Sequence, residues 1–198
     1  MILALNADAK PALILTKSDT VSEKKLDKAL RLAEAVDHLD SVFVVNSFNQ
    51  DQVEPIYSYL AKDEPTTVAL MGASGAGKST LINSLCGTEL ETQEVRKQDS
   101  RGRHTTTFRE MHPFAEVSAI IDTPGIRAIG MWDAEHGIAK YFNSIYTAME
   151  QCEYSRCTHT GEQGCGISEA VSAGSVTQES LELWKALIEE NSETTQDR

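Results

Sequence analysis

The segment from Gly72 to Thr80 contains residues whose types and spacing suit the binding of phosphate groups. Its sequence, GASGAGKST, fits the pattern G-x-x-x-x-G-K-[ST] and follows a short apolar run. In such a loop the backbone N–H groups cradle phosphates, the lysine neutralises the outer phosphates and the serine hydroxyl ligates Mg²⁺. We therefore predict nucleotide contacts from Gly72, Ala73, Ser74, Gly75, Ala76, Gly77, Lys78, Ser79 and Thr80, with Ser79 as a magnesium ligand.

A second motif, DTPG, places Asp122 and Gly125 at the spacing of the D-x-x-G switch that senses Mg²⁺ and the γ-phosphate. Alone it would indicate only a turn, since Asp, Pro and Gly are common turn residues. A phosphate loop earlier in the same chain favours the nucleotide switch. Many GTPases have a glutamine directly after this motif to orient water, but Ile126 stands there and cannot hold one.

The segment TKSD indicates which base is bound. Guanine offers a ring N–H and an exocyclic amine that one carboxylate can accept together, and Thr16, Lys17 and Asp19 fit the [NT]-K-x-D pattern that supplies this carboxylate. Adenine would leave the carboxylate of Asp19 unpaired. The same pattern disfavours an ATPase or a kinase. Ser47 lies where a second guanine-contacting segment would fall, although its neighbours match that segment loosely.

Near the C-terminus, three cysteines and one histidine have the spacing of a metal site. Cys152, Cys157, His159 and Cys165 follow the pattern C-x4-C-x-H-x5-C. Three thiolates and an imidazole form a suitable closed tetrahedral set for structural zinc, and Gly161 and Gly164 allow the chain to turn around the ion. Reduced core cysteines are the alternative, but the polar residues around them favour the metal.

The elements that must position these residues alternate between strand and helix. Apolar runs at 12–15, 41–45, 67–71 and 117–122 predict strands, and helices are predicted after Thr20, across 51–60 and after the phosphate loop. Thr20 and Glu23 form a capping-box pattern at the first of these helices. Alternation of this kind predicts an α/β fold with a parallel sheet covered on both faces. Leu181, Trp184, Leu187 and Ile188 share one helical face, which favours packing within the protein over partner binding.

Along the chain, the two predicted base-contacting segments, TKSD and the one with Ser47, come before the phosphate loop. The loop is followed by a switch segment, GRHTTT, and then by DTPG, which is predicted to sense magnesium. This order is a circular permutation of the usual GTPase order. Together TKSD, GASGAGKST, GRHTTT, DTPG and CEYSRCTHTGEQGC resemble the ribosome small subunit-dependent GTPase A family (RsgA-type) over nearly the whole chain. The resemblance implies a circularly permuted Ras-like P-loop GTPase. It also implies a role in late maturation of the small ribosomal subunit, with GTP hydrolysis that the subunit stimulates and a C-terminal zinc domain that helps to dock on ribosomal RNA.

The resemblance also implies roles for the GRHTTT segment. His104 would position the attacking water, and Thr105 or Thr106 would close on Mg²⁺, with Thr106 the better candidate. The domain boundaries that follow are a GTPase domain at 1–145, a zinc-binding domain at 146–191 and a disordered tail at 192–198. Members of the family carry an N-terminal OB-fold, which these residues do not include. By this resemblance the chain begins inside what should be a helix. The strand before that helix, which in a Ras-like sheet lies between the phosphate-loop strand and the guanine-loop strand, is missing, and we expect the chain to be a fragment.

Composition sets limits on partners. The 198 residues contain 18 Lys and Arg against 30 Asp and Glu, for a net charge of −12. Nonspecific nucleic-acid binding by the whole surface is therefore disfavoured, and RNA contact is expected to be local, through Arg96, Lys97, Arg101, Arg103 and His104.

Apolar runs are too short to span a membrane, and the N-terminus is unlike a signal peptide. We expect a cytoplasmic monomer that binds GTP or GDP and has no membrane partner. The alternative function is a nucleotide-dependent RNA-binding scaffold with little turnover.

Overall fold

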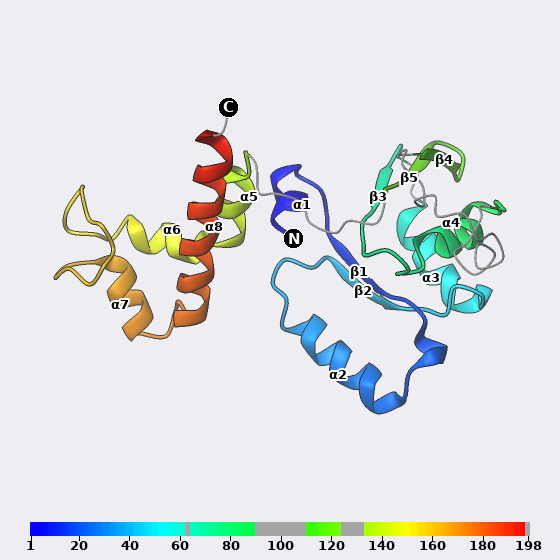
Figure 1. Cartoon of the computed structure of the whole chain (residues 1–198), viewed down its shortest axis with the longest axis horizontal. Coiled ribbons are helices and arrows are strands. Elements are labelled where there is room, and N and C mark those ends of the chain that lie inside the picture. Colours follow the sequence, from blue (N-terminus) through cyan, green and yellow to red (C-terminus); the bar gives the residue numbers. More distant parts are fainter. Residues whose placement is uncertain (62–63, 90–109, 124–132, 197–198) are drawn as a thin grey trace, which may run out of the picture. The chain divides into compact units, whose positions relative to one another are not determined.

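Short strands and helices carry the nucleotide motifs in one part of the chain, and helices alone surround the cysteine cluster in the other (Figure 1). The computed structural model describes residues 1–61, 64–89, 110–123 and 133–196. The chain divides into two compact units, each of which is described by itself. The helical unit comprises Met1–Pro11, Asp37–Asp40 and Gly130–Arg198, and the sheet unit comprises Ala12–Val36 and Ser41–Ile129.

The sheet unit contains two small sheets. In one, β1 (Ala12–Leu15) pairs in parallel with β2 (Ser41–Val44). In the other, β5 (Ser118–Asp122) lies between β3 (Thr67–Leu70), which is parallel to it, and β4 (Glu110–Phe114), which is antiparallel. Among the described residues, β1 pairs only with β2 and β3 only with β5, so each presents an edge at which no strand is paired.

The antiparallel strand β4 corrects the prediction of an all-parallel sheet. Its sequence, EMHPF, has no β-branched residue and contains Pro113, so propensity does not identify it as a strand. Proline lacks a backbone N–H and is tolerated only at an edge strand, which is the place of β4 in the strand order β3-β5-β4. The α/β class itself is confirmed.

The described part of the sheet unit also contains three α-helices: α2 (Glu23–Glu34), α3 (Gln50–Leu60) and α4 (Lys78–Cys86). Buried side chains of α3, α4 and the strands, together with Val45 just after β2, form one core. It contains Val45, Val53, Ile56, Leu70, Leu81, Ile82, Leu85, Phe114 and Ile120. Ala33, the buried residue of α2, is not part of it. The predicted capping box at α2 is wrong. The residue that precedes α2 is Ser22, while the hydroxyl of Thr20 donates to the carbonyl of Lys17 at 2.8 Å within the short 3₁₀ helix η1 (Ser18–Thr20).

The helical unit is built from α1 (Ile2–Asn6), α5 (Glu135–Tyr141), α6 (Asn143–Met149), α7 (Gly166–Ser172) and α8 (Gln178–Gln196). Its core contains Ile2, Ile138, Phe142, Ile145, Ile167, Leu181 and Trp184, among others. Leu187 and Ile188 of α8 pack against this core, so the predicted apolar face of the helix is buried within the protein.

Two asparagines cap the start of α5. Asn6 accepts from the N–H of Gly137 at 2.9 Å and donates to the carbonyl of Asp133 at 2.8 Å, while the buried Asn191 accepts from the N–H of Ala134 at 3.0 Å. These bonds satisfy N–H groups that have no partner inside the helix. Gly137 also permits α1 to lie close, because a side chain there would collide with the backbone of Ile2. Residues from both ends of the chain therefore hold α5.

The two compact units divide the chain at other positions than the predicted domain boundaries. The predicted boundary after residue 145 falls inside α6, and α1 packs with α5 in the helical unit. The tail predicted at 192–198 also differs, since α8 continues to Gln196. Among the described helices, none combines the length and apolar character that crossing a membrane requires.

Candidate nucleotide site and candidate metal centre

The phosphate loop joins the end of β3 to the start of α4, as its sequence predicts. Gly75 and Gly77 have φ values of 78° and 89°, a left-handed conformation that glycine adopts without a steric penalty. Gly77 is the residue that precedes α4, so the loop leads directly into the N-terminus of a helix. Free N–H groups and the helix dipole at such a terminus favour an anion.

Lys78 and Ser79 open α4 beside the end of β5. The ammonium of Lys78 donates to the carbonyls of Gly72 at 3.0 Å and Ala73 at 3.3 Å, so it is held over the loop. The hydroxyl of Ser79 donates to Oδ2 of Asp122 at 3.5 Å. In addition, the hydroxyl of Thr123 donates to the carbonyl of Leu70 at 2.5 Å, which ties the end of β5 to the end of β3.

Asp122 is buried and has an unsatisfied oxygen. No partner for its Oδ1 lies within the described part of the chain. Burial raises the pKa of Asp122, while the positive charge of Lys78 nearby lowers it. A buried carboxylate oxygen without a partner is costly, and a cation would relieve that cost. The Asp122 and Ser79 oxygens therefore fit a magnesium site.

The TKSD segment, which is predicted to recognise the base, lies against the phosphate loop. The hydroxyl of Thr16 donates to the carbonyl of Ala76 at 2.6 Å, and the ammonium of Lys17 donates to the carbonyl of Gly75 at 2.7 Å. Lys17 itself has a left-handed backbone, with φ of 58°. Asp19 follows in η1 and is exposed. Two segments about sixty residues apart in sequence are thus joined at the strand ends, where ligands bind in α/β sheets.

The loop that holds Ser47 belongs to the same group of contacts. Ser47 is buried, and its carbonyl accepts a hydrogen bond from the hydroxyl of Ser84 on α4. The carbonyl of Val45 accepts from the N–H of Ser18 at 3.3 Å. Sequence reasoning missed Ser84, because a serine within a helix has no motif of its own.

Several predicted site residues lie outside the described residues. These are Gly125 of the switch, His104 and the threonines Thr105 and Thr106 of GRHTTT, and the basic residues Arg96, Lys97, Arg101 and Arg103. Their roles stay predictions. The structure brings together Thr16, Lys17, the loop from Gly72 to Thr80, Ser47 and Asp122.

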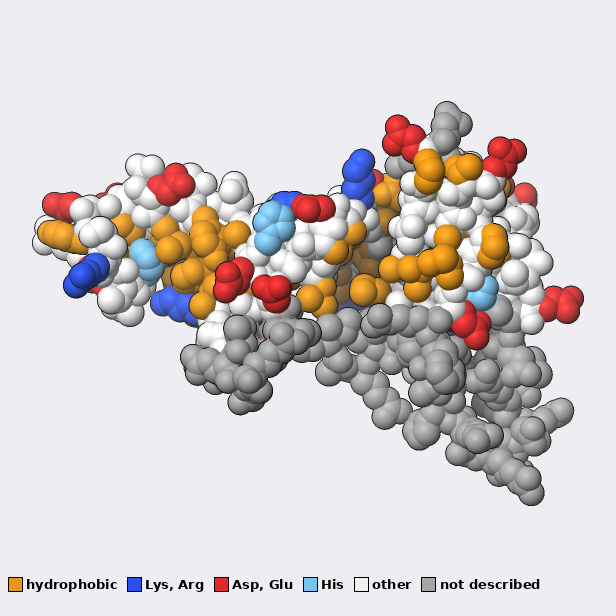
Figure 2. Space-filling model, turned by 90° about the horizontal axis from the view of Figure 1, so that it is seen from above, with side chains coloured by type: hydrophobic (Ala, Val, Ile, Leu, Met, Phe, Trp, Pro, Cys, Tyr) orange, Lys and Arg blue, Asp and Glu red, His pale blue; other side chains and the backbone are white. Residues whose placement is uncertain are grey.

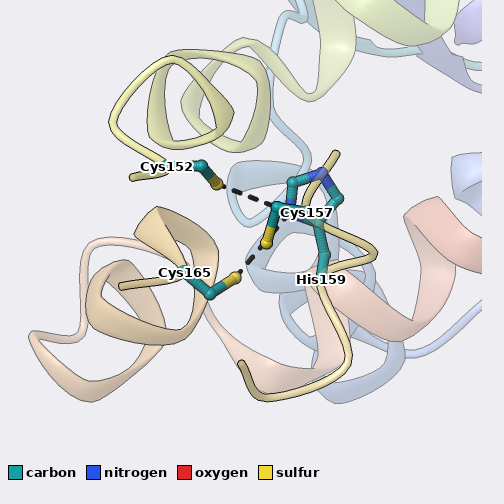
Figure 3. A group of neighbouring side chains, drawn as sticks. All are labelled: Cys152, Cys157, His159 and Cys165. Carbon is teal, nitrogen blue, oxygen red and sulfur yellow. Dashed lines mark hydrogen bonds between the residues drawn. The ribbon is translucent and has the colours of Figure 1, made fainter. Parts of the chain in front are cut away.

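The four predicted metal ligands converge in the helical unit (Figure 3). One donor atom from each of Cys152, Cys157, His159 and Cys165 lies within 4.8 Å of the others. Nδ1 of His159 is 3.6 Å from Sγ of Cys152 and 3.7 Å from Sγ of Cys165. Around a tetrahedral zinc ion with usual bond lengths, neighbouring nitrogen and sulfur ligands would lie about 3.6 Å apart. This Cys₃His cluster could therefore hold a metal ion.

Local backbone geometry explains how the ligands meet. Gly161 and Gly164 have φ values of 109° and 75°, which supply the predicted turns. The N–H of Glu153 donates to the carbonyl of Gly164 at 2.9 Å and closes the loop. The N–H of Gly166 donates to Sγ of Cys152 at 3.3 Å, so the start of α7 also contacts this ligand.

The thiols of the cluster differ in acidity. For Cys165, which precedes α7, desolvation is outweighed by hydrogen bonds from the hydroxyl and N–H of Ser168, and its pKa is lowered to about 6. For Cys157, the N–H of His159 favours the thiolate, but desolvation and the other two cysteines outweigh it and raise its pKa to about 11. Three sulfurs this close cannot all ionise readily without a cation between them.

One further residue shapes this loop. Glu162 accepts hydrogen bonds from the hydroxyl of Thr158 and from backbone N–H groups, and these lower its pKa to about 2. Sequence reasoning missed Glu162, although a carboxylate shortly after a Thr-His-Thr turn is a signal that could have indicated it.

The phosphate loop between β3 and α4, Asp122 at the end of β5, the TKSD segment that precedes them in the chain, and the solved structures that this chain resembles define the class: a circularly permuted Ras-like P-loop GTPase fold. The crystal structure of YjeQ from Thermotoga maritima matches 95% of this chain and 62% of that chain, with a TM-score of 0.57 and 25% identity. The structure of YloQ, described as a circularly permuted GTPase, shares the fold over 95% of this chain and 60% of that chain, with a TM-score of 0.54 and 21% identity.

The family follows from the sequence comparisons. The RsgA GTPase family model matches residues 1–132, and the chain belongs to this family. A relative from Methanosarcina acetivorans is named small ribosomal subunit biogenesis GTPase RsgA. It is 36% identical in an alignment of 194 positions, which covers 96% of this chain and 51% of the relative. One of the same name from Mesorhizobium japonicum is 34% identical in an alignment of 199 positions, which covers 98% of this chain and 56% of the relative. The chain spans about half the length of the curated relatives it matches.

Proposed function

We propose that this chain binds GTP with Mg²⁺ and hydrolyses it to GDP and phosphate, as a factor in biogenesis of the small ribosomal subunit. The observation that carries the proposal is the pair of bonds from Thr16 and Lys17 to the phosphate loop. These bonds put the carboxylate that follows, Asp19, on a segment joined to the loop that would hold the phosphates. A nucleotide on this loop would therefore have its base near a guanine-selective acceptor.

The substitution Asp19→Asn tests the base assignment. An amide donates where the carboxylate accepted, so GTP affinity should fall by about 10²-fold. Affinity for XTP should hold or rise, because xanthine offers a carbonyl where guanine has its amine. Competition binding with GTP, XTP and ATP measures the change.

The matched control is Asp27→Asn, which makes the same charge change on the exposed surface of α2, where Asp27 pairs with Arg31. It should leave all three affinities unchanged. Equal losses for GTP and XTP in Asp19→Asn would refute the guanine assignment.

The residues of the magnesium site have distinct roles in this proposal. Ser79 and Asp122 would hold the ion, which neutralises developing charge on the β- and γ-phosphate oxygens. Lys78 binds those same phosphates and keeps them in position. Support comes from the 3.5 Å approach of Ser79 to Asp122 and from the unpartnered Oδ1 of Asp122. Thr106 is proposed as a further ligand from the switch segment, and Gly125 as a backbone contact to the γ-phosphate.

Hydrolysis also requires a group that orients water, and we assign this role to His104. Ile126 cannot supply it, and the family resemblance of GRHTTT is what supports His104. A histidine on a switch segment must be ordered before it can act. We therefore expect slow hydrolysis by the chain alone and faster hydrolysis with the small subunit, which would order this segment.

The substitution His104→Ala should separate binding from turnover. GTP affinity should stay within about twofold, because the base and phosphates are held elsewhere. Stimulated hydrolysis should fall by roughly 10²-fold or more, since the lost group acts in the transition state. Single-turnover rates with small subunits present measure the effect. A mutant that keeps the wild-type stimulated rate would show that His104 has no part in orienting water.

For the Cys₃His cluster we propose one structural zinc ion. Three thiolates and an imidazole with no fifth protein donor are the usual closed set for this metal. Cys152, Cys157, His159 and Cys165 would bind it, and the ion would fix the loop between α6 and α7. We retain the predicted assignment of zinc binding to 146–191 as a functional region, within a helical unit that also includes α1 and α5.

The proposed partner is the small ribosomal subunit and its RNA, in the cytoplasm, with the chain as a monomer. Asp and Glu side chains are spread over the face in Figure 2, with few Lys or Arg among them. An acidic surface repels phosphates. RNA contact is therefore proposed for the local basic segment that contains Arg96, Lys97, Arg101 and Arg103, which lies outside the described residues.

A further inference from the structure

The metal ligand His159 has an unusual backbone conformation. Its φ is 59°, in the left-handed region that residues other than glycine seldom adopt. Such a backbone is sterically unfavourable for a residue with a Cβ atom, so neighbouring contacts must stabilise it. The conformation has a consequence for the metal, because it aims Nδ1 of the ring at the sulfurs of Cys152 and Cys165 (Figure 3).

The carboxylate of Glu162 binds the backbone on both sides of His159. Its Oε1 accepts from the N–H of Thr158 at 2.8 Å and from the Thr158 hydroxyl, and its Oε2 accepts from the N–H of Thr160 at 2.8 Å. The hydroxyls of Thr158 and Thr160 lie 2.9 Å apart and close the turn. One side chain thus binds the peptide group that directly follows His159, through the N–H of Thr160, and the peptide group between Cys157 and Thr158, so it holds the short turn that contains His159 at both ends.

We propose that Glu162 is a positioning residue for the metal ligand His159, acting through the backbone of Thr158 and Thr160. The proposal rests on the proposed metal at the Cys₃His cluster. Both carboxylate oxygens already accept hydrogen bonds from N–H and O–H donors. Glu162 therefore stabilises the turn and is not a fifth metal ligand. Loss of residues that orient metal ligands commonly weakens metal binding by about 10- to 100-fold.

Cobalt(II) binding to the whole chain tests the proposal, because Co²⁺ occupies zinc sites and its absorption reports the ligand set. Glu162→Ala should bind Co²⁺ about 10- to 100-fold more weakly than wild type. The Co²⁺ affinity of Glu162→Gln should lie between those of wild type and Glu162→Ala. The amide oxygen can still accept from Thr158, but the NH₂ group faces the N–H of Thr160 and cannot accept from it. The visible spectrum of Glu162→Ala should shift toward that of His159→Ala, as the imidazole leaves the metal.

The matched control is Glu169→Ala, which removes an exposed carboxylate from α7 nearby. It should keep wild-type affinity and spectrum. Wild-type affinity in Glu162→Ala would overturn the proposal. So would weaker affinity with an unchanged spectrum, because the carboxylate would then only stabilise the segment. If Glu162→Ala loses its helical circular dichroism, the Co²⁺ affinity and spectrum of Glu162→Gln decide the question instead. A wild-type chain that fails to bind Co²⁺ would instead overturn the metal assignment itself.

Discussion

Removal of metal from the Cys₃His cluster is expected to unfold the loop between α6 and α7 and to leave the phosphate-loop strand and helix folded. The apparent contribution of a structural zinc ion to folding is on the order of 10 kcal/mol. Without a cation, no charge in the cluster offsets the close approach of three sulfurs and an imidazole, whose donor atoms lie within 4.8 Å of one another. The loop packs on the core of the helical unit through Cys152, Cys157 and Cys165, so Trp184 in that core should report the change.

The measurement is tryptophan fluorescence during chelation, in a Trp132→Phe background that leaves Trp184 as the one remaining tryptophan of the two. GTP binding should persist at the end of the titration, because the sheet unit has a separate core. Cys165→Ser should mimic chelation, whereas Cys86→Ser, which changes the cysteine on α4, should not. Metal analysis that finds no zinc in protein purified without chelator would contradict the assignment.

Loss of the Lys78 ammonium is expected to weaken GTP binding by about 10²- to 10⁴-fold. Two hydrogen bonds to charged phosphates would be lost, each of about 1.5–3 kcal/mol. GMP lacks the β- and γ-phosphates that Lys78 would contact, so its affinity should change by less than about threefold. In the structure the ammonium already lies over the loop, on the carbonyls of Gly72 and Ala73.

Parallel titrations of GTP, GDP and GMP against Lys78→Ala measure how the loss of affinity depends on the number of phosphates. Lys28→Ala, on the exposed surface of α2, removes the same charge and should leave all three affinities unaltered. Unchanged GTP affinity in Lys78→Ala would mean that GASGAGKST is only a turn.

Much of the candidate site could be predicted because its chemistry is local in sequence. The glycines of the phosphate loop, the lysine and the serine follow one another, and left-handed φ values at Gly75 and Gly77 are what such spacing requires. The cysteine spacing likewise anticipated four donors in one place. The bonds between Thr16 and Ala76 and between Lys17 and Gly75 could not be predicted residue by residue, since only the tertiary fold joins these segments.

The features that sequence reasoning missed depend on tertiary contacts or break propensity rules. The strand β4 contains Pro113 and is stabilised by pairing with β5. The caps of α5 come from Asn6 and Asn191, which are remote in sequence from the helix they cap. Those contacts, with Gly137, also explain why α1 belongs to the helical unit.

Single-turnover hydrolysis of GTP, with and without small ribosomal subunits, tests the central claim most directly. The account predicts slow conversion of bound GTP to GDP by the chain alone, a faster rate when small subunits are added, and no comparable hydrolysis of ATP. Bound GTP that stays intact in both conditions would contradict it, and would favour a nucleotide-dependent scaffold in place of a GTPase.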